Sequence, residues 1–196
     1  GNAIQGYISN FRIVKGTALY TATFTPSTTP LQPIANTSLL TCQSGQFVDN
    51  SGSNLAVTVS GTPKVQKYSP FSITTLPTPY YSAYFNNTNS DYLSPASNSN
   101  LAFGSNAYTV EFWIFMASYT NSSNRVVELG SSNNSFGIQV NNTGTISITK
   151  YGASDVAASN ASFVVNQWNH VAVVRTNTSA NGVTFYLNGT SIGTGT

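Results

Sequence analysis

The stretch YTVEFWIFM, residues 108–116, is the part of the sequence that decides the fold class. Apart from Thr109 and Glu111, its residues are apolar at both odd and even positions. A strand with one face in water alternates apolar and polar side chains, whereas a strand covered on both faces is apolar throughout. The stretch therefore predicts a central β-strand that is buried on both sides.

Shorter segments on either side of this stretch alternate apolar and polar residues with a period of two. Residues 55–60, 136–140 and 183–188 each follow the pattern, which is typical of a half-buried strand. Pairs such as Asn-Gly, Ser-Gly and Asn-Asn separate the segments and mark turns, and no stretch keeps a helical period. The sequence predicts about a dozen short strands in an antiparallel sandwich or barrel.

The composition excludes several classes of protein. Charged residues make up 6% of the 196 residues and hydrophobic residues 40%, which is unlike a disordered chain. The longest apolar run, residues 112–117, is far shorter than the roughly 20 residues of a membrane-spanning helix. The Lys and Arg residues are scattered singly and the net charge is +2, which leaves no basic face for nucleic acid. We expect a globular domain with no nucleic-acid partner and no membrane insertion.

Two segments rich in proline and threonine, residues 24–33 and 69–79, interrupt the strand pattern. Proline has no backbone donor and biases the preceding residue away from helix, so both segments are predicted to be extended connectors. The first divides the chain into a leader, 1–35, and a body, 36–196, and the second is a surface loop within the body. The sequence begins at Gly1 without an initiator methionine, which suggests a processed product or a piece of a longer chain.

Several segments resemble the concanavalin A-like, laminin-G-like jelly roll. TVEFWIFM (109–116), WNHVAVVR (168–175) and FYLNGTSIGT (185–194) resemble its successive inner strands in order and spacing. AYFNNTNSDYL (83–93) is similar to the family's FDG-x-gDYL strand, and SLLTCQSGQFVDNSG (38–52) to its first strand and the following turn. The resemblance implies an all-β, two-sheet antiparallel jelly-roll sandwich.

The leader resembles the strand that normally ends such a domain. GYISNFRIVKGTALYTATFTP (6–26), followed by residues 37–71, is similar to junctions between tandem laminin-G-like domains in structural and tail-fibre proteins of marine bacteriophages. The family's last strand thus comes first, so we expect one repeat cut out of register. Because an open sheet edge is a liability, the leader is expected to close this sandwich or that of a neighbouring repeat or protomer. The resemblance implies a virion appendage or another extracellular location.

The carboxylates do not form a catalytic pair. There are five (Asp49, Asp91, Glu111, Glu128 and Asp155), and none lies within four residues of another. Glycosidases with a sandwich of the kind that the resemblance implies carry Glu-x-Asp-x-(x)-Glu on one strand, so that two carboxylates face one cleft. Since this pattern is absent, we expect no enzymatic activity. Glu111 is interpreted as a structural acid that pairs with a cation such as Arg175.

Three other reactive residues are expected to have structural roles. Ser191 lies in GTSIG, which matches the G-x-S-x-G nucleophile elbow, but no helix follows and Asn188-Gly189 reads as a hairpin turn. His170 has no Cys or carboxylate at ligand spacing and is interpreted as a sheet histidine. Cys42, the single cysteine, is expected to be a small buried hydrophobe on a strand.

Calcium and sugar sites remain open alternatives. The resemblance makes calcium possible, with Asp49 in the turn FVDNSGSN and Asp91 as candidate ligands, although Asp-Asn-Ser-Gly also suits an ordinary turn. Exposed aromatic rings stack on sugars, and the candidates in loop-like contexts are Tyr80, Tyr81, Tyr119 and Tyr151. A tyrosine in such a context is more often a loop anchor.

The sequence therefore supports two hypotheses of function. The first is a non-catalytic structural or adhesive repeat of an extracellular or virion appendage, such as a phage tail fibre, that contacts neighbouring repeats through its leader and also surface glycans. The alternative is a carbohydrate-binding lectin module of a secreted or cell-surface protein. No cofactor other than calcium is expected under either hypothesis.

Overall fold

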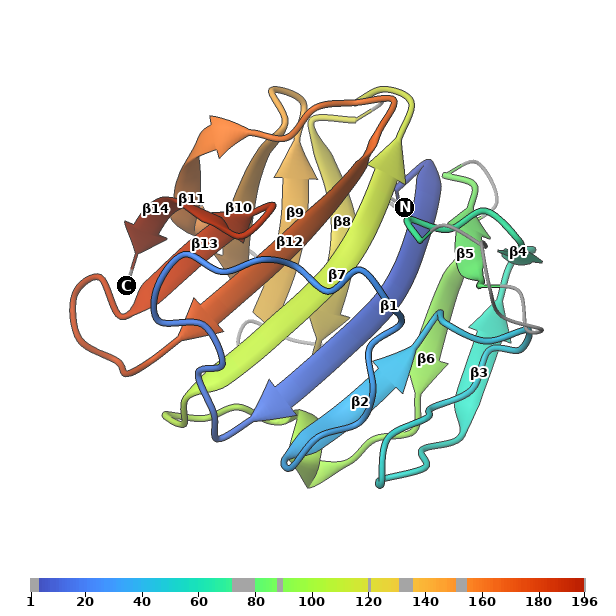
Figure 1. Cartoon of the computed structure of the whole chain (residues 1–196), viewed down its shortest axis with the longest axis horizontal. Helices are drawn as coiled ribbons and strands as arrows, with labels where there is room; N and C mark the ends of the chain where they lie inside the picture. Colours follow the sequence, from blue (N-terminus) through green and yellow to red (C-terminus); the bar gives the residue numbers. More distant parts are fainter. Residues whose placement is uncertain are drawn as a thin grey trace.

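The computed structural model describes residues 4–71, 80–87, 90–119, 121–130, 136–150 and 155–195. These residues form β-strands and one short 3-10 helix (Figure 1). The elements are β1 (Gly6–Lys15), β2 (Thr37–Thr41), β3 (Val57–Ser60), β4 (Lys64–Gln66), β5 (Ser82–Phe85), β6 (Tyr92–Pro95), η1 (Ser99–Leu101), β7 (Tyr108–Met116), β8 (Ser123–Leu129), β9 (Phe136–Asn141), β10 (Thr145–Lys150), β11 (Asp155–Ser162), β12 (Trp168–Arg175), β13 (Val183–Leu187) and β14 (Thr190–Gly195). None of the described residues belongs to a helix long and apolar enough to cross a bilayer.

The strands form two facing sheets and a small ribbon. The large sheet has the order β14-β13-β12-β7-β1-β5-β4, with β2 also paired to β1, and the second sheet has the order β11-β10-β9-β8. Figure 1 shows the second sheet behind the large one, and the ribbon β3-β6 beside them. Neighbouring strands are antiparallel, for example β1 with β7 and β9 with β10. The predicted all-β, two-sheet antiparallel sandwich is confirmed.

The core lies between the two sheets and is centred on β7. Val110, Phe112 and Ile114 of β7 pack in one buried cluster with Ile138 and Ile146 of the second sheet. The polar residues of the same strand are buried too, on the opposite face of the large sheet, and Glu111 has no exposed surface. The predicted central strand, covered on both sides, is therefore confirmed.

The leader strand β1 lies in the middle of the large sheet. It pairs with β7 on one side, and on the other with β5 near its start and with β2 near its end. The predicted pairing of residues 6–14 with residues 38–43 is thus present, and it occurs within one chain. The division into a leader, 1–35, and a body, 36–196, stays a prediction.

A connector of residues 16–36 joins β1 to β2 across the outer face of the large sheet. In Figure 1 it runs in front of β7 and β12 before it turns back toward β2. Tyr20 and Phe24 of the connector pack on a small apolar cluster of Ala172, Val174 and Tyr186, and the amide of Phe24 donates to the carbonyl of Gly189 at 3.0 Å. The connector therefore covers the part of this face over β7, β12 and β13. It does not cover the part over β4, β5 and the start of β1.

Candidate functional site

The outer face of the large sheet carries a buried ion pair where β1 and β7 meet. Arg12 lies directly opposite Glu111 in the register of these strands. Its Nε and Nη2 donate to Glu111 Oε1 at 2.8 and 2.6 Å, and its Nη1 donates to the carbonyl of Gln32 in the connector at 2.8 Å. Both side chains are buried. The ion pair thus joins the two central strands and fixes the connector above them.

The second oxygen of Glu111 is occupied as well. The hydroxyl of Tyr20 donates to Oε2 at 2.8 Å, and His170 Nε2 lies 3.3 Å from the same atom. Burial alone raises the pKa of Glu111, but the hydrogen bond from His170 and the charge of Arg12 outweigh it and lower the pKa below its ordinary value. Burial and the neighbouring carboxylate raise the pKa of Tyr20 well above its ordinary value. Glu111 is therefore an ionised group with both oxygens engaged.

The structure corrects the expected partner of Glu111 and confirms His170 as a sheet histidine in β12. The partner of Glu111 is Arg12 and not Arg175, because Arg175 lies opposite Tyr108 at the end of β7 and donates to the carbonyl of Asn106 at 3.0 Å. His170 does have a carboxylate partner, which the chain spacing of 59 residues concealed. Sequence spacing failed in both cases because the partners sit on strands that are far apart in the chain.

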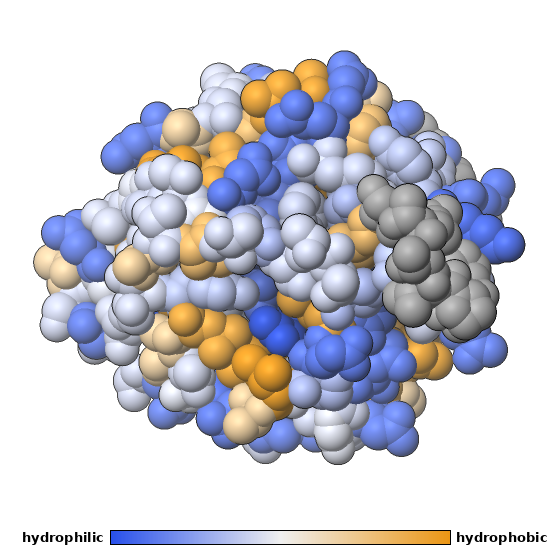
Figure 2. Space-filling model, viewed as in Figure 1, coloured by the Kyte–Doolittle hydropathy of each residue, from blue (hydrophilic) through white to orange (hydrophobic). Residues whose placement is uncertain are grey.

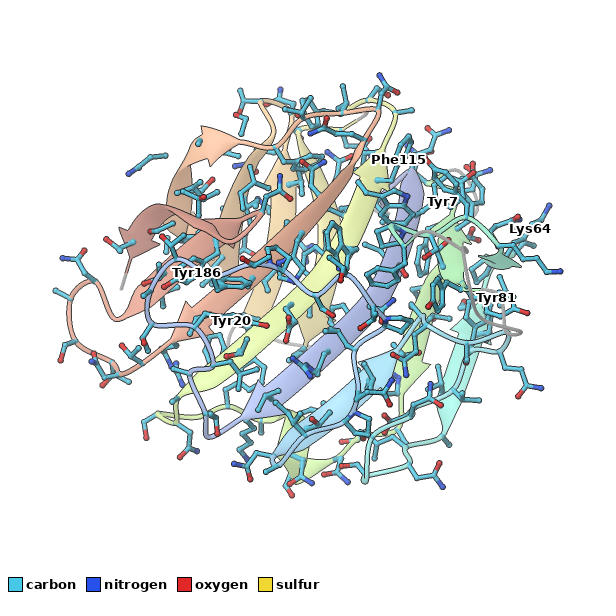
Figure 3. All side chains as sticks on the ribbon, in the orientation of Figure 1. Tyr7, Tyr20, Lys64, Tyr81, Phe115 and Tyr186 are labelled. Atoms are coloured by element: carbon cyan, nitrogen blue, oxygen red, sulfur yellow. The ribbon has the colours of Figure 1, made fainter. Side chains whose placement is uncertain are left out.

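Beside this network, one row of side chains crosses the outer face of the large sheet. Lys64 lies opposite Tyr84, Tyr84 opposite Tyr7, Tyr7 opposite Phe115, and Phe115 opposite Trp168. Directly opposed residues point to the same face of a sheet, so these five residues of β4, β5, β1, β7 and β12 form a single line, here called the transverse row. Figure 3 shows Phe115 and Tyr7 side by side, with Lys64 further toward the edge of the sheet. At about 4.8 Å between strands, the row spans about 19 Å.

The rings of the transverse row are in contact with one another and with one further ring. The centroids of Tyr7 and Tyr84 are 5.0 Å apart, and those of Phe115 and Trp168 are 5.9 Å apart. Tyr68 lies against the row, 4.9 Å from Tyr7, 5.2 Å from Phe115 and 5.3 Å from Trp168, and it is 42% exposed. The row and Tyr68 together present aromatic rings to the solvent at one end of the face.

Two indole N–H groups on this face have no partner. Trp168 Nε1, in the row, and Trp113 Nε1, on the same face of β7, are buried without a hydrogen bond to any described residue. Buried donors are normally satisfied by protein or by ordered water, and because both atoms are buried, ordered water is the expected partner. Figure 2 shows mostly hydrophilic and pale atoms over the described part of this front face, with one hydrophobic band below the centre of the view and smaller hydrophobic areas elsewhere. Such a surface suits a polar ligand better than an apolar one.

Comparison with models of known protein families identifies the family of this chain. A family model described as the concanavalin A-like lectin/glucanases superfamily matches residues 87–196, which is more than half of the chain. The chain belongs to this superfamily. No curated protein and no solved structure gives a significant match. The superfamily includes both lectins and glycosidases, so membership alone leaves the activity to be argued from the residues.

The carboxylates whose side chains the structure describes are bonded to separate partners. Asp49 and Asp91 accept hydrogen bonds from backbone amides, and Glu128 pairs with Arg125 at 3.0 Å. Asp155 lies in β11 of the second sheet. Glu111 therefore stands alone on the face that the described part of the large sheet turns outward, with no second described carboxylate bonded to its network.

The two candidate calcium ligands are engaged as turn residues. Asp49 Oδ1 accepts from the amides of Leu40 and Ser51, and Oδ2 accepts from the Ser51 hydroxyl and the Leu55 amide. Asp91 accepts from two amides as well, one on each oxygen. No cluster of three or more potential metal-binding side chains is found among the described residues. Donors directed at every Asp49 oxygen do not fit a cation, and calcium binding stays an untested prediction.

The four candidate sugar-binding tyrosines have different surroundings. Tyr80 packs edge-on against Phe71, and the carbonyl of Tyr81 accepts from Ser9 at 2.8 Å on the outer face. The hydroxyl of Tyr119 donates to the carbonyl of Phe163, and its ring packs against the same residue, as a loop anchor does. Tyr151 lies outside the described residues. None of the four belongs to the transverse row.

The remaining candidates have structural surroundings. Ser191 lies in β14, and the Asn188-Gly189 turn, with φ of 50° and 82°, joins β13 to β14 as predicted. Cys42 is buried in the core, but it follows β2 at a φ of 61° and is not part of a strand. Burial raises the pKa of its thiol to about 12.

Sequence reasoning missed the transverse row. Its signal was present in part, because Trp113 and Phe115 share the parity of Thr109 and Glu111 and hence the outer face of their strand. Only the register of five strands, however, aligns Lys64 with Trp168.

Proposed function

We propose that this chain is a non-catalytic adhesive module that contacts glycans through the transverse row and Tyr68. The observation that carries the proposal is the line of aromatic side chains on neighbouring strands, next to a ring that is 42% exposed. Aromatic rings stack on the apolar faces of sugars, and the polar groups around such rings fix the orientation of a ligand. A row that crosses five neighbouring strands suits an extended chain of sugars.

The absence of catalysis is part of the proposal. Retaining and inverting glycosidases both need two carboxylates that flank the scissile bond. Glu111 has its oxygens occupied by Arg12, Tyr20 and His170, so it has no free lone pair aimed at a substrate, and no second carboxylate is bonded to its network in the described part of the chain. Binding without turnover is what such a face supports.

We further propose that the module works as a repeat of an extracellular or virion appendage such as a tail fibre. The support is the resemblance of residues 6–71 to junctions between tandem domains, together with the central position of β1, which lets a leader close a sandwich. A lectin module of a secreted or cell-surface protein would use the same row. Images of the native assembly distinguish a filament from an isolated domain.

The experiment that tests the glycan contact is an array of oligosaccharides and polysaccharides probed with the full chain. We expect binding that falls about fivefold or more in Trp168→Ala and in Tyr68→Ala, since a stacked ring contributes on the order of 1 kcal/mol or more. Tyr92→Ala is the matched control, because Tyr92 is 53% exposed but lies in the β3-β6 ribbon. Failure of the chain to bind any glycan, or equal loss in all three variants, would overturn the proposal.

A further inference from the structure

The charged side chains of this protein are almost all engaged with one another or with carbonyl groups. Of the seven cations, Arg12 and Arg125 form ion pairs with Glu111 and Glu128. Lys15 donates to the carbonyl of Ser99, and Arg175 to that of Asn106. The side chain of Lys150 lies outside the described residues. The cations left over are Lys64 and Lys67.

Lys64 and Lys67 are exposed, and neither has a hydrogen bond or ion pair with any described residue. No acidic side chain in the described part of the chain is bonded to either lysine. Four of the five carboxylates are bonded elsewhere, and the fifth, Asp155, lies in β11 of the other sheet. A pair of uncompensated positive charges in a protein with 6% charged residues is therefore a local feature and not part of a general charged surface.

Lys64 belongs to the transverse row, and Lys67 follows it three residues later in the chain. Lys64 ends the row, opposite Tyr84, and Figure 3 shows it at the β4 edge of the sheet. Lys67 directly precedes Tyr68, the ring that packs against Tyr7, Phe115 and Trp168. The positive charge thus adjoins the aromatic platform at its β4 end.

We infer that the transverse row selects anionic polysaccharides, whose sugar rings lie on the aromatic side chains while a sulfate or carboxylate group is held by Lys64 and Lys67. This inference rests on the proposed glycan contact and adds the class of glycan. An anion on a sugar ring can pair with either lysine without first breaking an ion pair. Because no described carboxylate is bonded to these lysines, no neighbouring negative charge repels the anion there. Lysines also protect exposed sheet edges from pairing with another strand. This role does not account for Lys67, because Lys67 lies outside β4.

The inference is tested by measuring the affinity of the full chain for matched polysaccharides by affinity electrophoresis. Agarose is the neutral member, carrageenan the sulfated one and alginate the carboxylated one. We expect tighter binding to at least one anionic member, and the two anionic arms identify which group is preferred. Lys64→Gln and Lys67→Gln should each weaken anionic binding roughly two- to fivefold. Lys67 lies outside the row, so Lys67→Gln should leave agarose binding unchanged. High salt should remove the same increment.

Lys15→Gln is the matched control, because it removes the same charge at a different place. Tyr7 lies near the start of β1, and Lys15 is the last residue of that strand. If Lys15→Gln weakens anionic binding as much as Lys67→Gln, net charge is responsible and the inference is wrong. If the chain binds agarose and carrageenan equally and the lysine variants change nothing, the inference fails while the proposed glycan contact stands. If the chain binds glycans of the array but neither carrageenan nor alginate, the inference fails and the proposed function stands; if it binds no glycan of the array, the proposed function itself fails.

Discussion

Glu111 connects three parts of the molecule through two oxygen atoms. Arg12 belongs to the leader strand, Tyr20 to the connector and His170 to β12, and all three contact this one carboxylate. Removing one partner of a buried ion pair leaves the other charge without compensation. The network is therefore the point at which a single substitution separates the leader from the sheet.

We expect Glu111→Gln to lower the free energy of unfolding by about 3 kcal/mol at neutral pH, because the buried Arg12 guanidinium loses its counter-charge. Glu128→Gln is the control. Its ion pair with Arg125 is partly exposed, and its loss should cost at most about 1 kcal/mol. Urea denaturation of both variants measures the difference. Equal stability of the Glu111 variant and the wild type would show that the network contributes nothing.

The same carboxylate predicts how stability depends on pH. The pKa of Glu111 is lower in the folded state than its ordinary value of 4.5, so the unfolded chain takes up the proton first. Its contribution to stability is complete above that ordinary value and is lost as the pH falls through the lower folded pKa. We expect the melting temperature of the wild type to fall in acid more steeply than that of Glu111→Gln. Parallel curves for the two proteins would contradict this assignment.

Cys42 gives a second prediction at the residue scale. With a pKa of about 12, its buried thiol is almost entirely protonated at neutral pH, and the thiolate is the reactive form. We expect no reaction with a thiol reagent such as dithiobis-nitrobenzoate in the native protein, and one thiol per chain after denaturation. A rapid native reaction would place Cys42 outside the core.

At the scale of elements, β1 is the strand on which the large sheet depends. It buries Ile8, Phe11 and Ile13 in the core, and each such side chain stabilises the fold by roughly 1.5 to 3 kcal/mol. We expect the body alone, residues 36–196, to melt at a markedly lower temperature or to self-associate, and to recover when a peptide of residues 1–30 is added. Melting and sedimentation of the body with and without this peptide measure both effects.

A peptide with Ile13→Asp is the control for this complementation, since Ile13 has no exposed surface in the sheet. If the body is monomeric, melts like the full chain and ignores both peptides, the leader is only a linker. The idea of a repeat cut out of register would then be wrong.

Much of the element pattern was predictable from the sequence, and most of the site was not. Residues 108–116 revealed their double burial through composition alone, and the pairing of the leader with residues 38–43 followed from the family resemblance. The partner of Glu111 could not be predicted, because Arg12 is 99 residues away and becomes its neighbour only through the register of β1 and β7. The transverse row needed the registers of five strands at once, which no local period encodes.

At the scale of the whole molecule, the outer face of the large sheet has two parts. The connector covers one part, and the aromatic row lies in the other. The covered part contains the acid, and the open part contains the rings and the free lysines. We therefore expect no release of reducing sugar from laminarin or agarose, by the wild type or by Glu111→Gln, in an assay that detects a single turnover per chain. Turnover that disappears in Glu111→Gln would refute the non-catalytic assignment.

The central position of β1 also has a mechanical consequence. Tension applied to the chain on the N-terminal side of β1 pulls along the axis of a strand that is bonded on both edges, to β7 on one side and to β5 and β2 on the other. These hydrogen bonds then carry the force in shear and together, whereas an edge strand that is peeled sideways releases its bonds one after another. A filament built from such modules would transmit tension along its length without the unfolding of its first module.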